Sequence, residues 1–375
     1  MKLDAPRSVR GCLALAVLTA ATVLSSCSDQ SSGPAAGAAS VAVTPESATL
    51  LVQTTRQLTA TVRDANGTEL TGRPLAWKSG NVAVATVDAS GLVTALSAGS
   101  AAVIATSEGV SDTAAITVGT LSVGSVTAGG SHTCGLTAAG TYCWGSGGRL
   151  GDGSTTPSSV PVAVTGGLTF YAVTAGAYST CGVTTSGAPY CWGFRWGSPD
   201  SVPVAVPGGH QFSAVTVGGG FGPDHACGLT TSGAAYCWGN NTYGELGDGT
   251  ASSAEVYNGW YISSVPVAVE GGLTFSALSA SNAINTCGLT TSGAAYCWGD
   301  NEYGQLGGGS TGSRSLVPVA VAGGLMFGRL STGGYHGCGV TLGGLVYCWG
   351  SNSRGQLGDG TTTNTSVPVK VAEQP

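Results

Sequence analysis

The thirteen residues CGLTTSGAAYCWG occur twice in this chain without a single change, at Cys227–Gly239 and at Cys287–Gly299. Looser copies of the same stretch surround three further Trp-Gly pairs. The tryptophans of the five copies are Trp144, Trp192, Trp238, Trp298 and Trp349, with spacings of 48, 46, 60 and 51 residues. A period near 50 residues indicates one supersecondary unit that is repeated in a solenoid or a propeller.

The content of each unit favours a propeller. A unit contains, in order, a Pro-Val strand, a Gly-Gly turn, a strand with Phe or Val, a hairpin with a cysteine at each end, and a glycine-rich loop. Four short strands per unit are typical of a propeller blade. The 63 glycines among 375 residues suit many tight turns, because glycine adopts positive φ at little cost. We therefore expect an all-β protein in which residues 119–375 form a β-propeller.

The cysteines of the repeat predict one disulfide in each unit. When Cys227 is placed opposite Cys237 in an antiparallel hairpin, Thr231-Ser232-Gly233 remains as a three-residue turn with glycine where φ must be positive. This register brings the two sulfurs together. The first hairpin is one residue shorter and must use a different turn. The expected disulfides are Cys134–Cys143, Cys181–Cys191, Cys227–Cys237, Cys287–Cys297 and Cys338–Cys348. A zinc site would need four ligands that converge from two blades, so we expect no metal there.

The loop after each tryptophan carries a family signature. It reads WGNNTYGELGDGT at Trp238–Thr250, WGDNEYGQLGGGS at Trp298–Ser310 and WGSNSRGQLGDGT at Trp349–Thr361. Together with the PVAV segments, these loops resemble the repeats of the regulator of chromosome condensation superfamily over essentially all of residues 119–375. The resemblance implies a β-propeller, and members of this superfamily usually have seven blades.

The number of strands predicts five blades in this chain. It has five cysteine hairpins and five Pro-Val strands. The first unit begins without a Pro-Val strand, whereas Pro368–Val371 follows the last hairpin and has no hairpin after it. We expect Pro368–Val371 to pair into the first blade and close the ring. The alternative is an open ring that a second chain completes.

Residues 41–118 alternate apolar and polar residues in short runs, such as LTATVRD at Leu58–Asp64 and VAVATVD at Val82–Asp88. Such runs, separated by DANG and DASG turns, predict a β-sandwich of half-buried strands. Together with Trp77 and the GLVTA segment, they resemble the group 2 bacterial immunoglobulin-like domain. The segment contains no cysteine, so Trp77 must pack without an inter-sheet disulfide. The resemblance implies a spacer in a surface protein or, alternatively, an adhesin module.

Residues 1–26 have the pattern of a bacterial lipoprotein signal peptide. Three basic residues precede Gly11–Leu24, an apolar run that is too short to span a bilayer comfortably. The run ends in LSSC at Leu24–Cys27, which resembles the lipobox and implies cleavage before Cys27 and lipidation of its thiol. The alternative is an ordinary signal peptide that is cut nearby. Residues 27–40 then form a flexible linker, and we expect a protein anchored by lipid outside the cytoplasm, at the outer membrane or cell surface.

The charge of the chain argues against nucleic-acid binding. Only 9% of the residues are charged, and the formal net charge of −6 becomes about −8 once the leader is removed. An acidic, sparsely charged surface is a poor counter-ion for phosphate backbones.

Two segments that interrupt the repeat carry the candidate binding residues. The second unit replaces its long loop with GFRWGSPDS, which contains Phe194, Arg195 and Trp196, and the third unit gains ASSAEVYNGWYISS, which contains Tyr257, Trp260 and Tyr261. These residues are not needed to build a blade, and loops on a rigid scaffold commonly carry binding. We therefore expect them to contact a partner. The alternative is that they fill gaps between irregular blades.

Other polar residues recur at fixed places of the unit. His132, His225 and His336 each stand two residues before the first cysteine of a hairpin, and Asp152, Asp248 and Asp359 lie in LGDG loops. We expect the histidines to form structural hydrogen bonds and the aspartates to cap tight turns rather than to bind a metal ion. No Ser-His-Asp set or cluster of carboxylates stands out, so we expect no catalytic residue and no cofactor.

These features predict a non-catalytic protein of the cell envelope, whose propeller on an Ig-like stalk binds a protein or a glycan outside the cytoplasm. The superfamily that the repeats resemble includes secreted inhibitors of β-lactamase, which makes enzyme inhibition one alternative. A purely structural surface protein is the other alternative.

Overall fold

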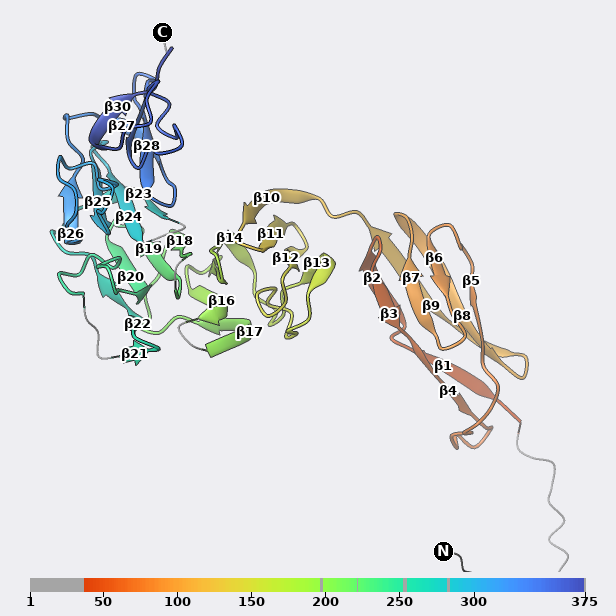
Figure 1. Cartoon of the computed structure of the whole chain (residues 1–375). Helices are drawn as coiled ribbons and strands as arrows, with labels where there is room; N and C mark the ends of the chain where they lie inside the picture. Colours follow the sequence, from red (N-terminus) through yellow and green to blue (C-terminus); the bar gives the residue numbers. More distant parts are fainter. Residues whose placement is uncertain (1–36, 196–197, 221, 252–254, 282–283, 374–375) are drawn as a thin grey trace, which may run out of the picture.

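The computed structural model describes residues 37–195, 198–220, 222–251, 255–281 and 284–373. All regular elements in these ranges are β-strands, as the sequence predicts. A two-layered sandwich up to Gly119 is followed along the chain by a series of five sheets (Figure 1). Within the described ranges, no helix has the length and apolar character needed to cross a membrane.

The sandwich buries one core between its sheets. Its strands are β1 (Ser40–Thr44), β2 (Ser47–Leu51), β3 (Thr55–Gln57), β4 (Thr59–Arg63), β5 (Ala76–Ser79), β6 (Ala85–Val87), β7 (Leu92–Ala95), β8 (Gly99–Ser107) and β9 (Val110–Gly119). They form a sheet in the order β2-β9-β8-β5, a sheet in the order β3-β7-β6, and the pair β1-β4. Alternating residues such as Val43, Val62 and Val103 face inward and form the core. The Trp77 ring packs against Gly91, where a Cβ would lie 2.9 Å from it, and needs no disulfide.

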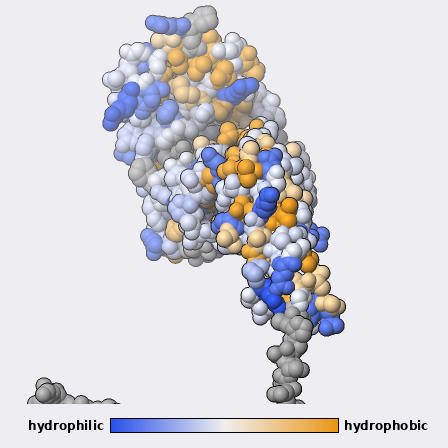
Figure 2. Space-filling model, turned by 90° about the vertical axis from the view of Figure 1, so that its right-hand side faces the viewer, coloured by the Kyte–Doolittle hydropathy of each residue, from blue (hydrophilic) through white to orange (hydrophobic). Residues whose placement is uncertain are grey.

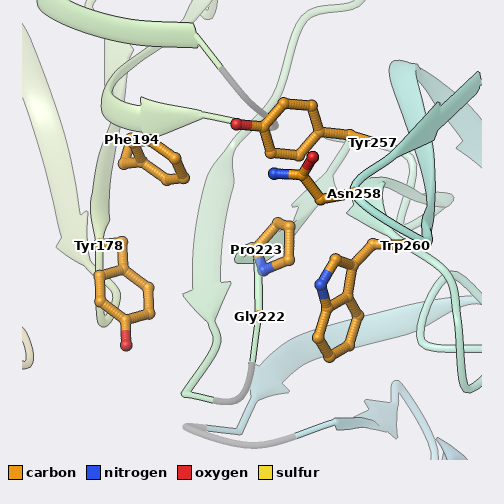
Figure 3. Close-up of a pocket in the computed structure, with 7 residues that line it drawn as sticks. All are labelled: Tyr178, Phe194, Gly222, Pro223, Tyr257, Asn258 and Trp260. Atoms are coloured by element: carbon orange, nitrogen blue, oxygen red, sulfur yellow. The ribbon is translucent and has the colours of Figure 1, made fainter.

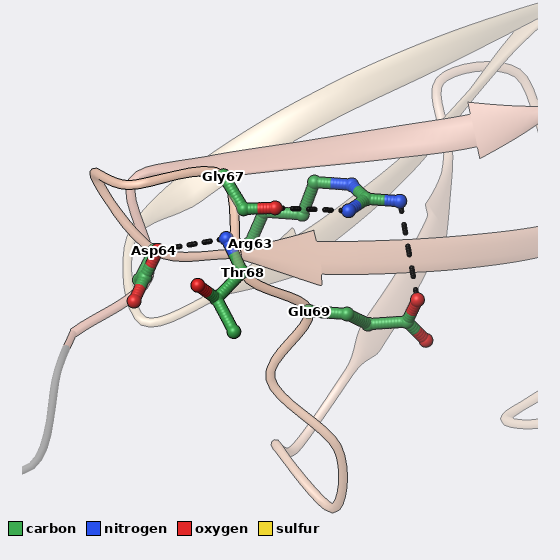
Figure 4. A network of polar contacts seen from close by, with 5 residues as sticks. All are labelled: Arg63, Asp64, Gly67, Thr68 and Glu69. Atoms are coloured by element: carbon green, nitrogen blue, oxygen red, sulfur yellow. Dashed lines mark hydrogen bonds and ion pairs between the residues drawn. The ribbon is translucent and has the colours of Figure 1, made fainter.

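The DANG turn after β4 is held by its own side chains (Figure 4). Asp64 Oδ1 accepts a hydrogen bond from the backbone N–H of Thr68 at 2.9 Å. Arg63 Nη1 donates to the Gly67 carbonyl at 2.9 Å, and its Nη2 lies 3.9 Å from Glu69 Oε2. An aspartate at the start of such a turn stabilises it locally, as the sequence pattern predicts.

The five sheets after the sandwich are the five predicted blades. The first blade contains β10 (Val123–Ala128), β11 (His132–Thr137), β12 (Gly140–Gly145) and β13 (Ser158–Ala163), and the second contains β14 (Phe170–Ala175), β15 (Ser179–Thr184), β16 (Pro189–Arg195) and β17 (Ser198–Ala205). The third contains β18 (Ala214–Gly218), β19 (His225–Leu229), β20 (Ala235–Asn240) and β22 (Trp260–Ala268), with β21 (Glu255–Tyr257) added at its edge. The fourth contains β23 (Phe275–Ala280), β24 (Asn285–Thr290), β25 (Ala295–Gly299) and β26 (Ser315–Ala320), and the fifth contains β27 (Phe327–Thr332), β28 (His336–Thr341), β29 (Val346–Gly350) and β30 (Thr365–Lys370).

The prediction that the C-terminal strand closes the ring was wrong. β30 pairs with β29 of its own blade, with Val369 opposite Cys348. In every unit the Pro-Val strand pairs with the hairpin that precedes it. A unit therefore starts with the Phe or Val strand and ends with the Pro-Val strand, so each antiparallel sheet is complete and no strand is left over. The blades form an arc in which the first and the fifth lie apart (Figure 1).

All five predicted disulfides are present. In the third blade Gly228 faces Tyr236, as the register predicts, and the turn residue Gly233 has a φ of +84°. The shorter first hairpin instead pairs Thr137 directly with Gly140, which leaves a two-residue loop.

Neighbouring blades always bury the same two faces against each other. We call the side of a blade that carries its disulfide the disulfide face, and the opposite side, which carries the tryptophan, the tryptophan face. From the first blade to the fourth, the disulfide face packs against the tryptophan face of the next blade. The tryptophans at these contacts are fully buried, namely Trp192, Trp238, Trp298 and Trp349. Both faces of an inner blade are apolar because both are covered.

Candidate functional site

The insertion of the third unit forms an additional hairpin at the edge of its blade. β21 pairs with the start of β22, and Tyr257 lies opposite Trp260. The connecting residues Asn258 and Gly259 have φ values of 48° and 85°, which fits the type I′ turn that an Asn-Gly pair favours. Ile262 is buried at the base of the hairpin. The tight turn and this buried anchor together fix where Tyr257 and Trp260 lie.

A hollow of about 240 Å³ lies between the second and third blades (Figure 3). We call it the first hollow, and its lining consists of Tyr178, Phe194, Gly222, Pro223, Tyr257, Asn258 and Trp260. Phe194 lies on β16, and its backbone N–H donates to the Tyr178 carbonyl at 2.9 Å. The first hollow therefore brings the replaced loop of the second unit to the insertion of the third.

A second hollow, of about 400 Å³, shares Gly222 and Trp260 with the first. Its lining consists of Gly222, Tyr243, Trp260, Ile284, Asp300, Glu302 and Tyr335, from the third, fourth and fifth blades. The Trp260 ring lies so close over Gly222 that a Cβ there would come within 2.6 Å of it. Gly222 also has a φ of +91°, which favours glycine. Trp260 and Gly222 thus join the linings of the two hollows, which together we call the aromatic groove.

A buried carboxyl group holds one wall of the first hollow in place. Asp224 Oδ2 accepts hydrogen bonds from the backbone N–H groups of Tyr178 and Ser179 at 2.9 and 2.8 Å, and from the Ser179 hydroxyl at 2.7 Å. Burial raises the pKa of Asp224 to about 6, although these hydrogen bonds favour the charged form. The bonds join the third blade to the second.

The second hollow is both aromatic and acidic. The Tyr335 ring packs edge-to-face against Tyr303, with the ring centroids 5.2 Å apart. Asp300 and Glu302 add two carboxyl groups. Burial raises the pKa of Asp300, although Gln305 Nε2 donates to its Oδ2 at 2.6 Å. Aromatic rings beside carboxylates suit a cationic group of a partner.

A further carboxyl group is buried directly behind Tyr243. Glu245 Oε2 accepts the backbone N–H of Tyr243 at 2.7 Å, whereas its Oε1 has no hydrogen-bond partner among the described residues. Burial raises the pKa of Glu245 to about 7, and the nearby charge of Asp300 acts in the same direction. Gln305 occupies the equivalent place in the fourth blade and accepts the backbone N–H of Tyr303 at 2.8 Å.

The structure brings three of the predicted binding residues together in one hollow: Phe194, Tyr257 and Trp260. Tyr261 follows Trp260 on β22, has 38% of its surface exposed and lines neither hollow. The backbone of Arg195 ends β16, where it pairs with Ser198. Trp196 and the predicted lipidation residue Cys27 lie outside the described residues.

Two of the three recurring histidines and all three recurring aspartates have structural partners. His132 Nε2 lies 2.7 Å from Thr180 Oγ1, and His225 Nε2 lies 2.9 Å from Thr286 Oγ1, so each histidine is linked to the next blade. Burial lowers the pKa of His225 to about 4. Asp248 Oδ1 accepts the backbone N–H two residues later at 3.0 Å and so caps its turn. In the part of the chain that the structure describes, no three His, Cys, Asp or Glu side chains gather as metal ligands.

The tyrosines that belong to the ordinary repeat were not predicted as site residues. Tyr178, Tyr243 and Tyr335 lie in AYST, NTYG and GYHG segments, which look like parts of the blade rather than a site. One usable signal was present, because the Asn-Gly pair between Tyr257 and Trp260 predicts a two-residue hairpin with these two aromatic residues opposite each other.

Two family descriptions match the chain. The bacterial Ig-like domain (group 2) matches residues 38–118. Models of the regulator of chromosome condensation (RCC1) repeat match residues 343–375, and also 219–245, 285–305 and 329–356.

The curated relatives match through a short part of their length. The human E3 ubiquitin-protein ligase HERC2 is 44% identical over 86 residues, which are 22% of this chain and 2% of the relative. The human probable E3 ubiquitin-protein ligase HERC4 is 35% identical over 82 residues, which are 21% of this chain and 8% of the relative. The chain therefore spans less than a tenth of the length of these relatives.

Solved structures show the same fold. Yeast RCC1 (Prp20), in its structure bound to Kap60, matches with a TM-score of 0.57 and 15% identity, over 87% of this chain and 74% of the other. Human WBSCR16 matches with a TM-score of 0.54 and 20% identity, over 66% of this chain and 67% of the other.

Proposed function

We propose that this chain, which carries a bacterial Ig-like domain followed by RCC1 repeats, is a lipid-anchored envelope protein that binds a protein partner in its aromatic groove. The combination of these two folds is that of a protein-interaction module. One observation supports the groove above all: two segments that break the repeat in different units meet in one hollow, at Phe194 and Trp260. Filling of gaps would not require aromatic side chains to line an open hollow.

The size and chemistry of the groove favour a protein partner. The first hollow, of about 240 Å³, is smaller than the sites of about 300–1,000 Å³ that hold whole ligands, and the second, of about 400 Å³, lies at the lower end of that range. Each has room for a single side chain of a partner. Trp and Tyr dominate interface hot spots because they bury large area with few rotatable bonds. The second hollow adds Asp300 and Glu302, which suit a basic side chain of the partner. We therefore infer that two neighbouring partner side chains enter, an apolar one in the first hollow and a basic one in the second.

The N-terminal part supplies the anchor in this proposal. The LSSC sequence that ends at Cys27 supports lipidation, and the linker of residues 27–40 separates it from the Ig-like domain. The Ig-like domain then acts as a spacer that holds the propeller away from the membrane. We propose no catalytic chemistry for the groove, because a binding scaffold accounts for its lining.

The test is a capture experiment with matched variants. Immobilised full chain, Trp260→Ala and Tyr261→Ala are incubated with envelope extract and secreted proteins, and in parallel with a glycan array. Tyr261→Ala is the control because Tyr261 is the next residue on the same strand and lines neither hollow. A hot-spot tryptophan contributes about 2 kcal/mol or more, so Trp260→Ala should weaken binding by at least about 30-fold.

The proposal is supported if a protein is retained by the natural chain and by Tyr261→Ala but lost from Trp260→Ala. Binding to a glycan instead would replace the protein partner with a carbohydrate. Equal retention by all three chains would place the binding surface elsewhere and refute the role of the groove.

A further inference from the structure

The two ends of the arc expose faces that are covered everywhere else. The tryptophan face of the first blade has no preceding blade. Val126 and Val123 on this face are 66% and 39% exposed. Trp144 is half-buried, whereas the tryptophans of the other four blades are fully buried. An apolar sheet face left open at one end of a stack is costly unless something covers it.

The disulfide face of the fifth blade is the other uncovered face. Cys338 and Val340 are partly exposed, whereas Cys287 and Leu289, their equivalents in the fourth blade, are 1% and 5% exposed. Val346, Val340 and Cys338 line a hollow of about 250 Å³ on this face, together with Arg329. Figure 2 shows apolar side chains gathered near the top of the molecule, at the height of the fifth blade in Figure 1.

Tryptophan hydrogen bonds show what the fifth blade lacks. At three blade contacts the indole N–H donates to a loop carbonyl of the preceding blade at 2.8–3.0 Å: Trp192 to Arg149, Trp298 to Glu245, and Trp349 to Gln305. Gln356 occupies the same place in the fifth blade, and no described group donates to its carbonyl. The glycine two residues later is covered by the tryptophan of the next blade in the fourth blade but not in the fifth. A Cβ at Gly307 would meet the Trp349 ring at 2.8 Å, whereas a Cβ at Gly358 would meet only Val371.

Within the described ranges, a hydrogen bond between a histidine of one blade and a threonine of the next is also missing at the fifth blade. The histidines of the first and third blades reach a threonine hydroxyl of the next blade, as His132 reaches Thr180 at 2.7 Å. His336 of the fifth blade is half-buried, and no further blade follows it among the described residues. Thr133 occupies, on the first blade, the place that Thr180 occupies on the second. The tryptophan face of the first blade therefore carries a tryptophan of the kind that every other disulfide face contacts on its neighbour, and a threonine of the kind that the histidines of the first and third blades reach. The disulfide face of the fifth blade contacts neither kind in the part of the chain that the structure describes.

We propose that a second copy of this chain docks head to tail, with the tryptophan face of its first blade against the disulfide face of the fifth blade. Trp144 of the second copy then lies over Gly358 and donates to the Gln356 carbonyl, and its Thr133 meets His336. The interface continues the contact that already joins the five blades of one chain. Because the two faces differ, the contact is heterologous. After one copy has docked, the pair still has one uncovered tryptophan face and one uncovered disulfide face, so further copies can add.

Arg329 is the main departure of the fifth blade from this pattern. It lies on the disulfide face opposite Val340, where the second, third and fourth blades carry Ala172, Ala214 and Ala277. A docked copy would cover this charged side chain, which weakens the contact. The association is therefore expected to be reversible, and Arg329→Ala should strengthen it.

The test uses the full chain with Cys27→Ser, so that no acyl chain contributes, in sedimentation velocity over a range of concentrations. Trp144→Glu blocks one face and Val340→Glu blocks the other. Each variant alone should sediment as a monomer, because a head-to-tail contact needs both faces. An equimolar mixture should form a dimer that grows no further, since each variant supplies the face that the other lacks. Val265→Glu is the control, because Val265 is 45% exposed on the outer strand of the third blade.

The outcomes separate the possible arrangements. A dimer in the mixture but in neither variant alone supports the proposal, with Arg329→Ala expected to lower the dissociation constant of the natural chain at least tenfold. A natural chain that stays monomeric at all concentrations would overturn it and indicate that the two faces remain open or meet within one chain. Association that persists in both single variants would overturn it as well, because another surface must then be responsible.

Discussion

Replacing Glu245 with glutamine should make this protein more stable at neutral pH. Glu245 is fully buried and its Oε2 accepts a hydrogen bond from the backbone N–H of Tyr243, while Oε1 has no partner among the described residues. The fourth blade has Gln305 in the same place, where Oε1 accepts the equivalent N–H at 2.8 Å and Nε2 donates to Asp300. Glutamine is therefore compatible with this loop and carries no charge.

The size of the effect follows from the pKa of Glu245. Burial raises this pKa from 4.5 to about 7, and each unit corresponds to about 1.4 kcal/mol of free energy. A carboxyl group with a raised pKa costs nothing below pH 4.5, costs more as the pH rises, and reaches its full penalty above pH 7. Glu245→Gln should thus increase the free energy of unfolding by about 3 kcal/mol at pH 8 and by very little at pH 4.5. The buried Asp224 titrates in both proteins, so its contribution cancels in the difference.

Urea unfolding followed by tryptophan fluorescence, at several pH values between 4.5 and 8, measures this difference. Gln305→Glu is the reciprocal control and should destabilise the protein at pH 8, since it places a second carboxylate against Asp300. A stability gain for Glu245→Gln below about 1 kcal/mol at pH 8 would refute the reasoning. A gain that does not shrink toward pH 4.5 would also refute it, because it would then not arise from ionisation.

Three further predictions concern packing, the groove and the crosslinks. Trp298→Phe should cost about 1–2 kcal/mol more than Trp238→Phe in chemical denaturation, because the Trp298 indole donates at 2.8 Å to a buried carbonyl, whereas that of Trp238 has no acceptor among the described residues; equal costs would contradict this. Gly222→Ala should displace the indole between the two hollows, weaken partner capture at least about tenfold and lower the free energy of unfolding by about 1–3 kcal/mol, since φ is +91° there and the ring is in contact. Removing the Cys227–Cys237 disulfide by a double alanine substitution should lower the free energy of unfolding by about 2–3 kcal/mol. As a control, the variant and the natural chain should unfold with the same free energy under reducing conditions.

The sequence predicts features that depend on neighbours along the chain. The disulfide between Cys227 and Cys237 follows from the length of one hairpin, and both its register and its turn were predicted correctly. Pro368–Val371 was assigned to the wrong blade because an alternating apolar strand has the same pattern whichever edge it joins. Its true partner depends on the loop that leads to it, and that loop returns to the same hairpin.

The aromatic groove could be predicted only in part for a similar reason. Phe194 and Trp260 stood out because they interrupt the repeat. Their meeting in one hollow depends on how the second and third blades pack. Tyr178 carries no such mark, since it lies in a segment that looks like every other unit. Its place in the groove results from the buried Asp224 of the next blade, which binds the backbone N–H groups of Tyr178 and Ser179 across sequence separations of 46 and 45 residues.

Each blade consists of consecutive strands and carries its own covalent crosslink, and none of the strands that the structure describes is exchanged between blades. A gene that encodes such a chain can gain or lose one unit by recombination, and the threading of the remaining units stays unchanged. The two identical stretches of thirteen residues are what a duplication of this kind leaves behind. The same arrangement lets the newly made chain fold from its N-terminus onward, because every blade has all its strands as soon as its own fifty or so residues have emerged.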